Sequence, residues 1–172
     1  MAGWAEHQEA LARVRLVALD VDGVLTDGRV IYVGDEEAQA FDVQDGQGLA
    51  WLRRAGVHVA WITGRGCEAT ERRGRELGVV ELHVGVRDKF ATLSEVQERL
   101  GVSADETLAM GDDVPDLGLA RGAGIFVAPA NARPEVQARA AFVTDASGGR
   151  GAVREACEAV LRARGAWDEL FA

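Results

Sequence analysis

The sequence predicts an α/β protein: a Rossmann-like three-layer sandwich with a mostly parallel central sheet, a small β-hairpin flap and no cap domain. Two observations predict this class. Short apolar runs alternate with helical segments of roughly 10–15 residues, which is the pattern of successive βαβ units. Polar residues directly follow three of these runs, at residues 20–22, 63–65 and 111–113. Because ligands of such folds bind at the carboxyl ends of the strands, the sequence predicts one crevice at that edge of the sheet.

The predicted strands are short and apolar. The first covers residues 15–21, with Leu16, Val17 and Leu19 ahead of the acidic residues. Similar strands are expected at residues 57–62, 79–84, 107–110, 125–128 and 141–144. Two further β-prone stretches, 29–33 and 38–43, flank a polar loop and predict the hairpin, at about residues 29–43.

Helices are expected between the strands. Their predicted ranges are residues 46–55, 67–77, 89–100, 116–120, 133–140 and 151–164, and the last lies in a C-terminal tail of about residues 148–172. Gly56, Gly78 and Gly101 follow the first three of these helices, where a glycine commonly ends a helix. The first strand is followed only by the hairpin, so no insertion of the size of a cap domain is expected.

Length and composition fit one globular domain over residues 1–172. The hydrophobic fraction is 48%, and no apolar run is long enough to cross a bilayer, so no membrane association is expected. The net charge is -9 and no basic stripe is visible, which argues against a nucleic-acid partner. Cys67 and Cys157 match no metal-ligand spacing, and the N-terminal residues lack the apolar segment of a secretory signal. We therefore expect a cytoplasmic protein.

The first strand ends in two carboxylates. Asp20 and Asp22 are two residues apart, so both point to the same side of the strand. Carboxylates held together repel each other and need a cation, and hard divalent cations prefer oxygen ligands. Gly23 allows the backbone to approach a ligand closely. Taken alone, this pair is explained equally well as two solvated acids at a strand end.

A second acidic cluster follows the fourth of the predicted sheet strands. Asp112, Asp113 and Asp116 come after Gly111. Taken alone, they are better explained as acids at a helix N-terminus, where the dipole favours negative charge. Two such clusters at one edge of a sheet can together hold one Mg²⁺.

Three further residues point to phosphate. Thr63 and Gly64 follow the second sheet strand, where a hydroxyl and a free N–H can both donate to a phosphoryl group, although Thr63 also suits a helix N-cap. Lys89 is the only lysine among 19 cationic residues, which suggests a place that arginine cannot fill. A metal, a lysine, a hydroxyl and backbone amides around a carboxylate describe phosphoryl transfer, with the carboxylate as nucleophile.

These residues, in this order, resemble the haloacid dehalogenase-like phosphohydrolases. The resemblance rests on Asp20-x-Asp22-Gly-Val, Thr63, Lys89 and Gly111-Asp112-Asp113-x-x-Asp116. It implies the following roles: Asp20 as nucleophile and Mg²⁺ ligand, Asp22 as general acid and base with its carbonyl on the metal, Asp112 as a further ligand, Asp113 and Asp116 in support, and Gly23, Thr63, Gly64 and Lys89 at the phosphoryl group.

Other stretches resemble the capless members that act on 3-deoxy-manno-octulosonate 8-phosphate. These are residues 22–28, 41–46 and 148–155. The resemblance implies a sugar-acid phosphate as substrate, a role in lipopolysaccharide biosynthesis, and a homotetramer built on the hairpins, in which residues 148–155 reach a neighbour's site. Val30, Tyr32, Phe41 and Val43 are expected to form the apolar face of the hairpin.

One departure from that pattern concerns the substrate. Gln44 stands where those phosphatases usually have an arginine, which suits a carboxylate better than an amide does. Arg65, Arg150 or Arg154 could bind the carboxylate in its place. Two alternatives follow: a phosphatase of a nine-carbon ulosonic (sialic-type) acid 9-phosphate, or a non-catalytic oligomerisation module.

Overall fold

The computed structural model describes residues 2–171 and contains a six-stranded sheet of order β5-β4-β1-β6-β7-β8. All neighbouring strands of this sheet are parallel. The strands are β1 (Leu16–Leu19), β4 (His58–Ile62), β5 (Glu81–His83), β6 (Thr107–Met110), β7 (Ile125–Ala128) and β8 (Phe142–Val143). The predicted fold class is therefore confirmed, and the sheet is parallel throughout.

Alternate residues of the central strand enter two separate cores. Val17 and Leu19 of β1 belong to one hydrophobic cluster, whereas Leu16 and Ala18 belong to the other. All four side chains are buried because successive residues of a strand point to opposite faces and helices cover both faces of this sheet. This is why the strands read as continuous apolar runs rather than alternating ones.

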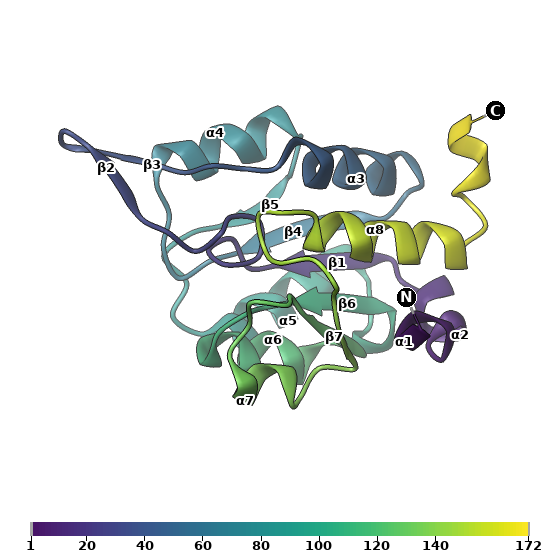
Figure 1. Ribbon diagram of the computed structural model, residues 1–172. Coiled ribbons are helices and arrows are strands. Elements are labelled where there is room, and N and C mark those ends of the chain that lie inside the picture. The colour runs from purple at the N-terminus through teal and green to yellow at the C-terminus, as the bar shows by residue number, and fades with distance from the viewer. Residues whose placement is uncertain (1, 172) are drawn as a thin grey trace.

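The helices form the two outer layers (Figure 1). One face is covered by α3 (Val43–Arg54), α4 (Glu68–Glu76) and α8 (Ala152–Ala163), and the other by α5 (Lys89–Leu100), α6 (Leu117–Gly122) and α7 (Pro134–Gln137). Two short N-terminal helices, α1 (Ala2–Ala5) and α2 (Gln8–Ala12), lie near the end of α8. Short 3-10 turns occupy residues 104–106, 114–116 and 168–171. Among residues 2–171, no helix is both long and apolar enough to cross a membrane.

The hairpin projects from the body of the molecule and is shorter than predicted (Figure 1). Its strands are β2 (Ile31–Val33) and β3 (Glu36–Ala38), paired antiparallel. The prediction that residues 38–43 form the second arm was wrong. Asp42 accepts a hydrogen bond of 2.6 Å from the Gln44 N–H and so caps α3, which begins at Val43. Phe41, expected on the exposed face, instead stacks against Trp61 with ring centroids 6.1 Å apart.

The order in which the strands are added to the sheet reverses at β1. From β1 the chain runs outward through β4 to β5, then crosses to β6 on the other side of β1 and continues to β7 and β8. The loops after β1, β4 and β6 therefore lie next to one another at the carboxyl edge, at a topological switch point. This arrangement brings the predicted polar clusters together.

The loop before α8 completes the carboxyl edge from the C-terminal side. Gly149 N donates to Val24 O at 2.9 Å, and Asn131 joins Gly148 N (2.6 Å) to Gly23 O (3.0 Å). A Cβ atom on Gly148 would overlap the Gly23 carbonyl, so this contact requires a glycine. Residues 148–149, expected to reach a neighbour's site, pack here against the chain's own loop.

Asp45 of α3 caps the N-terminus of α8. Its carboxylate accepts hydrogen bonds from Arg154 N (2.6 Å) and Gly151 N (3.4 Å), and the side chain is fully buried. Burial raises the pKa of Asp45 to about 6, against the lowering effect of those two hydrogen bonds. Neighbouring Asp42 adds to the rise.

This pKa predicts a pH-dependent stability. Because the folded-state pKa lies above the ordinary value of 3.8, protonation stabilises the fold, and this contribution is lost as the pH rises through about 6. In Asp45→Asn the amide oxygen still accepts a hydrogen bond from the Arg154 N–H, but the side chain at position 45 no longer titrates. Between about pH 5 and about pH 8, the unfolding free energy of the wild type should fall by about 1–2 kcal/mol relative to that of the variant. Urea unfolding of both proteins at the two pH values measures this difference, and parallel pH profiles would contradict it.

Candidate active site

The loops after β1, β4, β5 and β6 surround a crevice of about 290 Å³. The structure brings most of the predicted site residues to its walls. Those that line it are Asp20, Asp22, Thr63, Gly64, Arg65, Lys89, Asp112, Asp113 and Asp116.

Lys89 lies between two carboxylates at the floor of the crevice. Its Nζ is 2.6 Å from Asp20 Oδ1 and 2.5 Å from Asp116 Oδ1, and all three side chains are buried. Burial alone would lower the pKa of Lys89, but the charges of Asp20 and Asp116 outweigh it and raise the pKa. The ammonium therefore stays charged and joins the end of β1 to the loop after β6.

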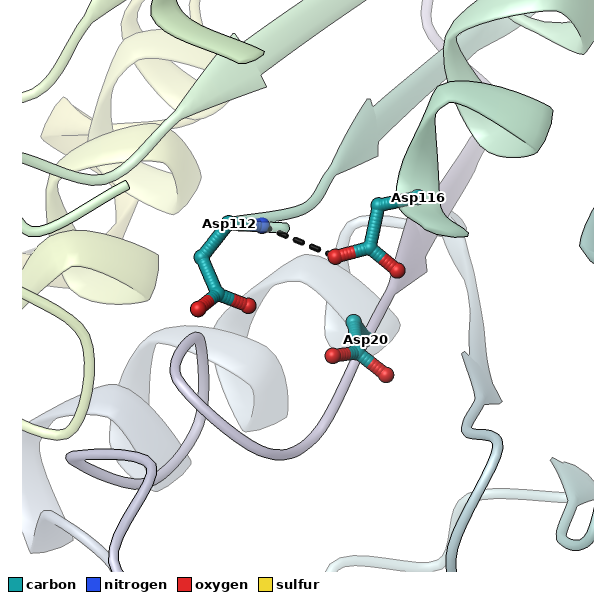
Figure 2. Close-up of side chains that lie close together, drawn as sticks. All are labelled: Asp20, Asp112 and Asp116. Carbon is teal, nitrogen blue, oxygen red and sulfur yellow. Dashed lines mark hydrogen bonds between the residues drawn. The ribbon is translucent and has the colours of Figure 1, made fainter. Parts of the chain in front are cut away.

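Asp116 organises the loop that follows β6. Its Oδ2 accepts hydrogen bonds from Asp112 N (2.9 Å) and Asp113 N (3.1 Å), the first of which Figure 2 shows. Its Oδ1 accepts from Lys89. Because both oxygens have protein donors, Asp116 is suited to positioning rather than to holding a metal ion.

Asp20 and Asp112 are better suited to a metal. The ligand oxygens of Asp20, Asp112 and Asp116 lie within 4.8 Å of one another, and Figure 2 shows the three side chains close together. Asp112 Oδ1 is buried and has no hydrogen-bond partner within residues 2–171. Burial raises the pKa of Asp20 and that of Asp112 to about 7 each, and the charge of Asp116 adds to both shifts. A small divalent cation that accepts oxygen ligands, such as Mg²⁺, satisfies the orphaned oxygen and offsets the repulsion.

Gly23 allows the two acidic loops to approach each other. Its φ is +90°, a left-handed value that favours glycine, and a Cβ atom there would overlap the carboxyl group of Asp112. Gly23 thus shapes the space around Asp112, although it does not itself line the crevice.

Thr63 and Gly64 form the wall at the end of β4. Thr63 is buried, its N–H donates to His83 O (2.9 Å) and its O accepts from Val86 N (3.0 Å). These bonds fix the backbone on both sides of Thr63, and both Thr63 and Gly64 line the crevice.

Asp22 lies at the entrance, where the hairpin meets the crevice. Its Oδ1 accepts a hydrogen bond of 2.9 Å from Gln39 Nε2, and its Oδ2 is 3.7 Å from Arg65 Nε. Arg65 Nη2 also donates to both carboxylate oxygens of Glu37, at 3.0 and 2.9 Å.

The other candidates for substrate binding lie away from this crevice. Arg154 stacks over the Trp51 ring at 4.2 Å and donates to Glu158 at 2.8 Å, so its guanidinium packs along α8. Arg150 lines a different depression, beside Asp27 and Phe41. Gln44 is exposed in the first turn of α3. None of these three residues lines the crevice.

Sequence reasoning missed Gln39, Asn131 and Arg87. Gln39 and Asn131 act through contacts with residues distant in the chain, for which the sequence contains no local signal. Arg87 lines the crevice, and its position two residues before Lys89 could have indicated this. Its exposed side chain has no acidic partner among residues 2–171.

The site sits on a parallel sheet and combines a buried acid after β1, a hydroxyl after β4, a lysine at the start of α5 and two acids after β6. This combination defines a phosphohydrolase of the haloacid dehalogenase type. The haloacid dehalogenase-like hydrolase family matches residues 76–155. The chain belongs to this family, because a relative that is 42% identical to it aligns with 91% of its length.

Within the family, the chain is similar to 3-deoxy-D-manno-octulosonate 8-phosphate phosphatases. It is 42% identical over 158 residues to that of Salmonella typhi, covering 91% of this chain and 84% of the relative. The crystal structure of the Moraxella catarrhalis phosphatase, in complex with magnesium ion, phosphate ion and KDO, aligns with a TM-score of 0.93 at 38% identity, covering 96% of each chain. A hypothetical protein from Xanthomonas campestris aligns with a TM-score of 0.93 at 45% identity, covering 97% of this chain and 92% of that one.

The acidic cluster predicts that Mg²⁺ stabilises the fold. Saturation at about 100 times the dissociation constant should raise the unfolding free energy by about 2.7 kcal/mol. Asp112→Asn should lose most of this gain, because it removes a ligand. Without Mg²⁺ at about pH 8, the same variant should be more stable than the wild type, because a buried repulsive charge is gone. Thermal unfolding with Mg²⁺ and with a chelator measures both expected changes in stability. Asp105→Asn, which changes an exposed acid outside the crevice, is the matched control. Equal Mg²⁺ responses of wild type and Asp112→Asn would exclude Asp112 as a ligand.

Proposed function

We propose that this protein is a Mg²⁺-dependent phosphatase that hydrolyses 3-deoxy-D-manno-octulosonate 8-phosphate through an aspartyl-phosphate on Asp20. The observation that carries the proposal is the buried Asp20–Lys89–Asp116 arrangement beside the unpartnered oxygen of Asp112. The similarity to phosphatases named for this eight-carbon acid supports the choice of substrate. The alternatives, a nine-carbon acid phosphate or a non-catalytic module, have no comparable support.

In the first half of the reaction, a carboxylate oxygen of Asp20 attacks phosphorus. Lys89 Nζ, Thr63 Oγ1 and the Gly64 N–H bind the phosphoryl oxygens and stabilise the charge that develops on them. The bond between phosphorus and the sugar oxygen breaks, and the Asp22 carboxyl group gives its proton to that oxygen. The products of this half are the free sugar acid and phosphorylated Asp20.

In the second half, the Asp22 carboxylate takes a proton from water as the water oxygen attacks phosphorus. The bond between Asp20 and phosphorus breaks, which releases inorganic phosphate and restores the carboxylate. Asp20, Asp112 and the main-chain carbonyl of Asp22 would hold the Mg²⁺, which when bound neutralises phosphoryl charge. Asp113 and Asp116 support the loop that carries Asp112.

We also propose a homotetramer assembled through the hairpins. Ile31, Tyr32 and Val33 of β2 and the nearby Val43 are exposed apolar side chains on a projecting element, and such patches commonly mark an interface. An open crevice also needs shielding from water. Light scattering should give about four times the mass of one chain.

We further propose a cytoplasmic location, consistent with the free thiols of Cys67 and Cys157, and a role in lipopolysaccharide biosynthesis.

The decisive test is phosphate release from 3-deoxy-D-manno-octulosonate 8-phosphate with Mg²⁺ and with excess chelator. The wild type should be active only with the metal. Asp20→Asn should lose more than about 10³-fold in kcat, since a neutral amide cannot attack phosphorus effectively. Asp105→Asn serves again as the control. Metal-dependent hydrolysis by Asp20→Asn at the wild-type rate would refute the mechanism.

We expect Arg87 to bind the substrate carboxylate in place of an arginine at position 44. Arg65 is the other arginine in the crevice, but Glu37 and Asp22 already neutralise it. A charge-assisted pair is worth about 1.5–3 kcal/mol, so Arg87→Ala should lower kcat/KM for the sugar-acid phosphate roughly ten- to a hundredfold. A neutral hexose phosphate should be affected little. Arg54→Ala, which removes an exposed arginine of α3, is the matched control. Equal losses on both substrates would argue against this role.

A further inference from the structure

Gln39, which follows β3, extends a side-chain amide from the hairpin to Asp22. Its Nε2 donates a hydrogen bond of 2.9 Å to Asp22 Oδ1. Among the described residues, this is the one side-chain hydrogen bond that the Asp22 carboxylate receives. Arg65 Nε, at 3.7 Å from Oδ2, lies beyond hydrogen-bond distance. The hairpin therefore contributes a direct contact to a residue that the proposed reaction uses twice.

The orientation of this amide is set from its other end. Gln39 Oε1 accepts a hydrogen bond of 2.5 Å from Thr70 Oγ1 and one of 3.3 Å from Cys67 Sγ. Rotating the amide by 180° would turn its carbonyl oxygen toward the Asp22 carboxylate, and two acceptors would then face each other. Thr70 is completely buried in α4, so the group that orients Gln39 is itself fixed.

The contacts form a directed series from α4 through the hairpin to the crevice. Thr70 donates to Gln39, and Gln39 donates to Asp22. A neutral donor at Oδ1 holds the carboxyl group in place and leaves Oδ2 to carry the proton. Held in one orientation, the carboxyl group needs less reorganisation to reach the leaving oxygen.

We propose that Gln39 is a positioning residue for proton transfer by Asp22. This inference rests on the proposed function. As the bond between phosphorus and the sugar oxygen breaks and the bond to Asp20 forms, the Asp22 proton moves to the sugar oxygen. Asp22 later takes a proton from the attacking water. Gln39 exchanges no proton and fixes the place from which both transfers occur.

Gln39→Met tests the proposal because it keeps the side-chain length but cannot donate a hydrogen bond. On the sugar-acid phosphate, kcat should fall about ten- to a hundredfold, part of the ~10²–10⁴-fold that general acid–base catalysis contributes. KM should change by less than about twofold, because Gln39 acts on proton transfer rather than on binding. A fall in kcat with little change in KM tests the proposal with the sugar-acid phosphate as the only substrate.

A second readout uses the leaving group. The p-nitrophenolate of p-nitrophenyl phosphate departs with little proton donation, so Gln39→Met should lower its hydrolysis by less than about threefold. Thr70→Val should show the same selectivity to a smaller degree, because it removes the hydroxyl that orients the amide. Gln47→Met, the same change at an exposed position of α3, should match the wild type on both substrates.

The outcomes separate the two proposals. No loss in Gln39→Met, or a rise in KM without a fall in kcat, would overturn the positioning role while leaving the phosphatase function intact. Equal losses on the sugar and aryl esters would also overturn it. A wild type that releases no phosphate from the sugar-acid phosphate would overturn the proposed function, and this inference with it.

Discussion

The site depends on one buried cation placed between two buried carboxylates. Moving an ammonium and two carboxylates out of water costs several kcal/mol per ion, which only close mutual pairing can offset. Lys89 pairs with Asp20 and Asp116 at 2.6 and 2.5 Å, so removing the lysine would leave two buried carboxylates without a compensating charge. The same contacts tie the end of β1, the start of α5 and the loop after β6 into one unit. The rest of the crevice is arranged around this unit, including Asp112, whose backbone N–H is held by Asp116.

The sequence predicted the fold well where the signals are local. The buried strands β1 and β6 read as apolar runs, and Gly101, in a left-handed conformation, ends α5 as predicted. The main elements of the site followed because parallel strands bring their carboxyl ends together, so Asp20, Thr63 and Asp112 had to be neighbours. The boundary between the hairpin and α3 was missed because one cap, Asp42, outweighed the β-prone residues around Val43.

The residues that sequence reasoning misplaced or missed depend on long-range contacts. Arg154 carries a charge that suits a substrate, but Trp51 lies under its guanidinium and Glu158 accepts from it. Asp45 looks like an ordinary acid in the first turn of α3, yet it caps a helix more than one hundred residues later. Gln39 has no charge and belongs to no motif. Its significance appears only when the hairpin, α4 and the loop after β1 are seen together.

The loop that carries Asp20 and Asp22 is completed by Asn131 and by residues 148–149, near the opposite end of the chain. On the ribosome, at about 5–20 residues per second, these partners emerge on the order of ten seconds after the loop itself. During that interval β1 also lacks β6, one of its two neighbours in the sheet. The acidic loop therefore cannot take its final shape before residues 148–149 have emerged. Until β6 emerges, β1 exposes one open edge of the growing sheet, to which chaperones can bind.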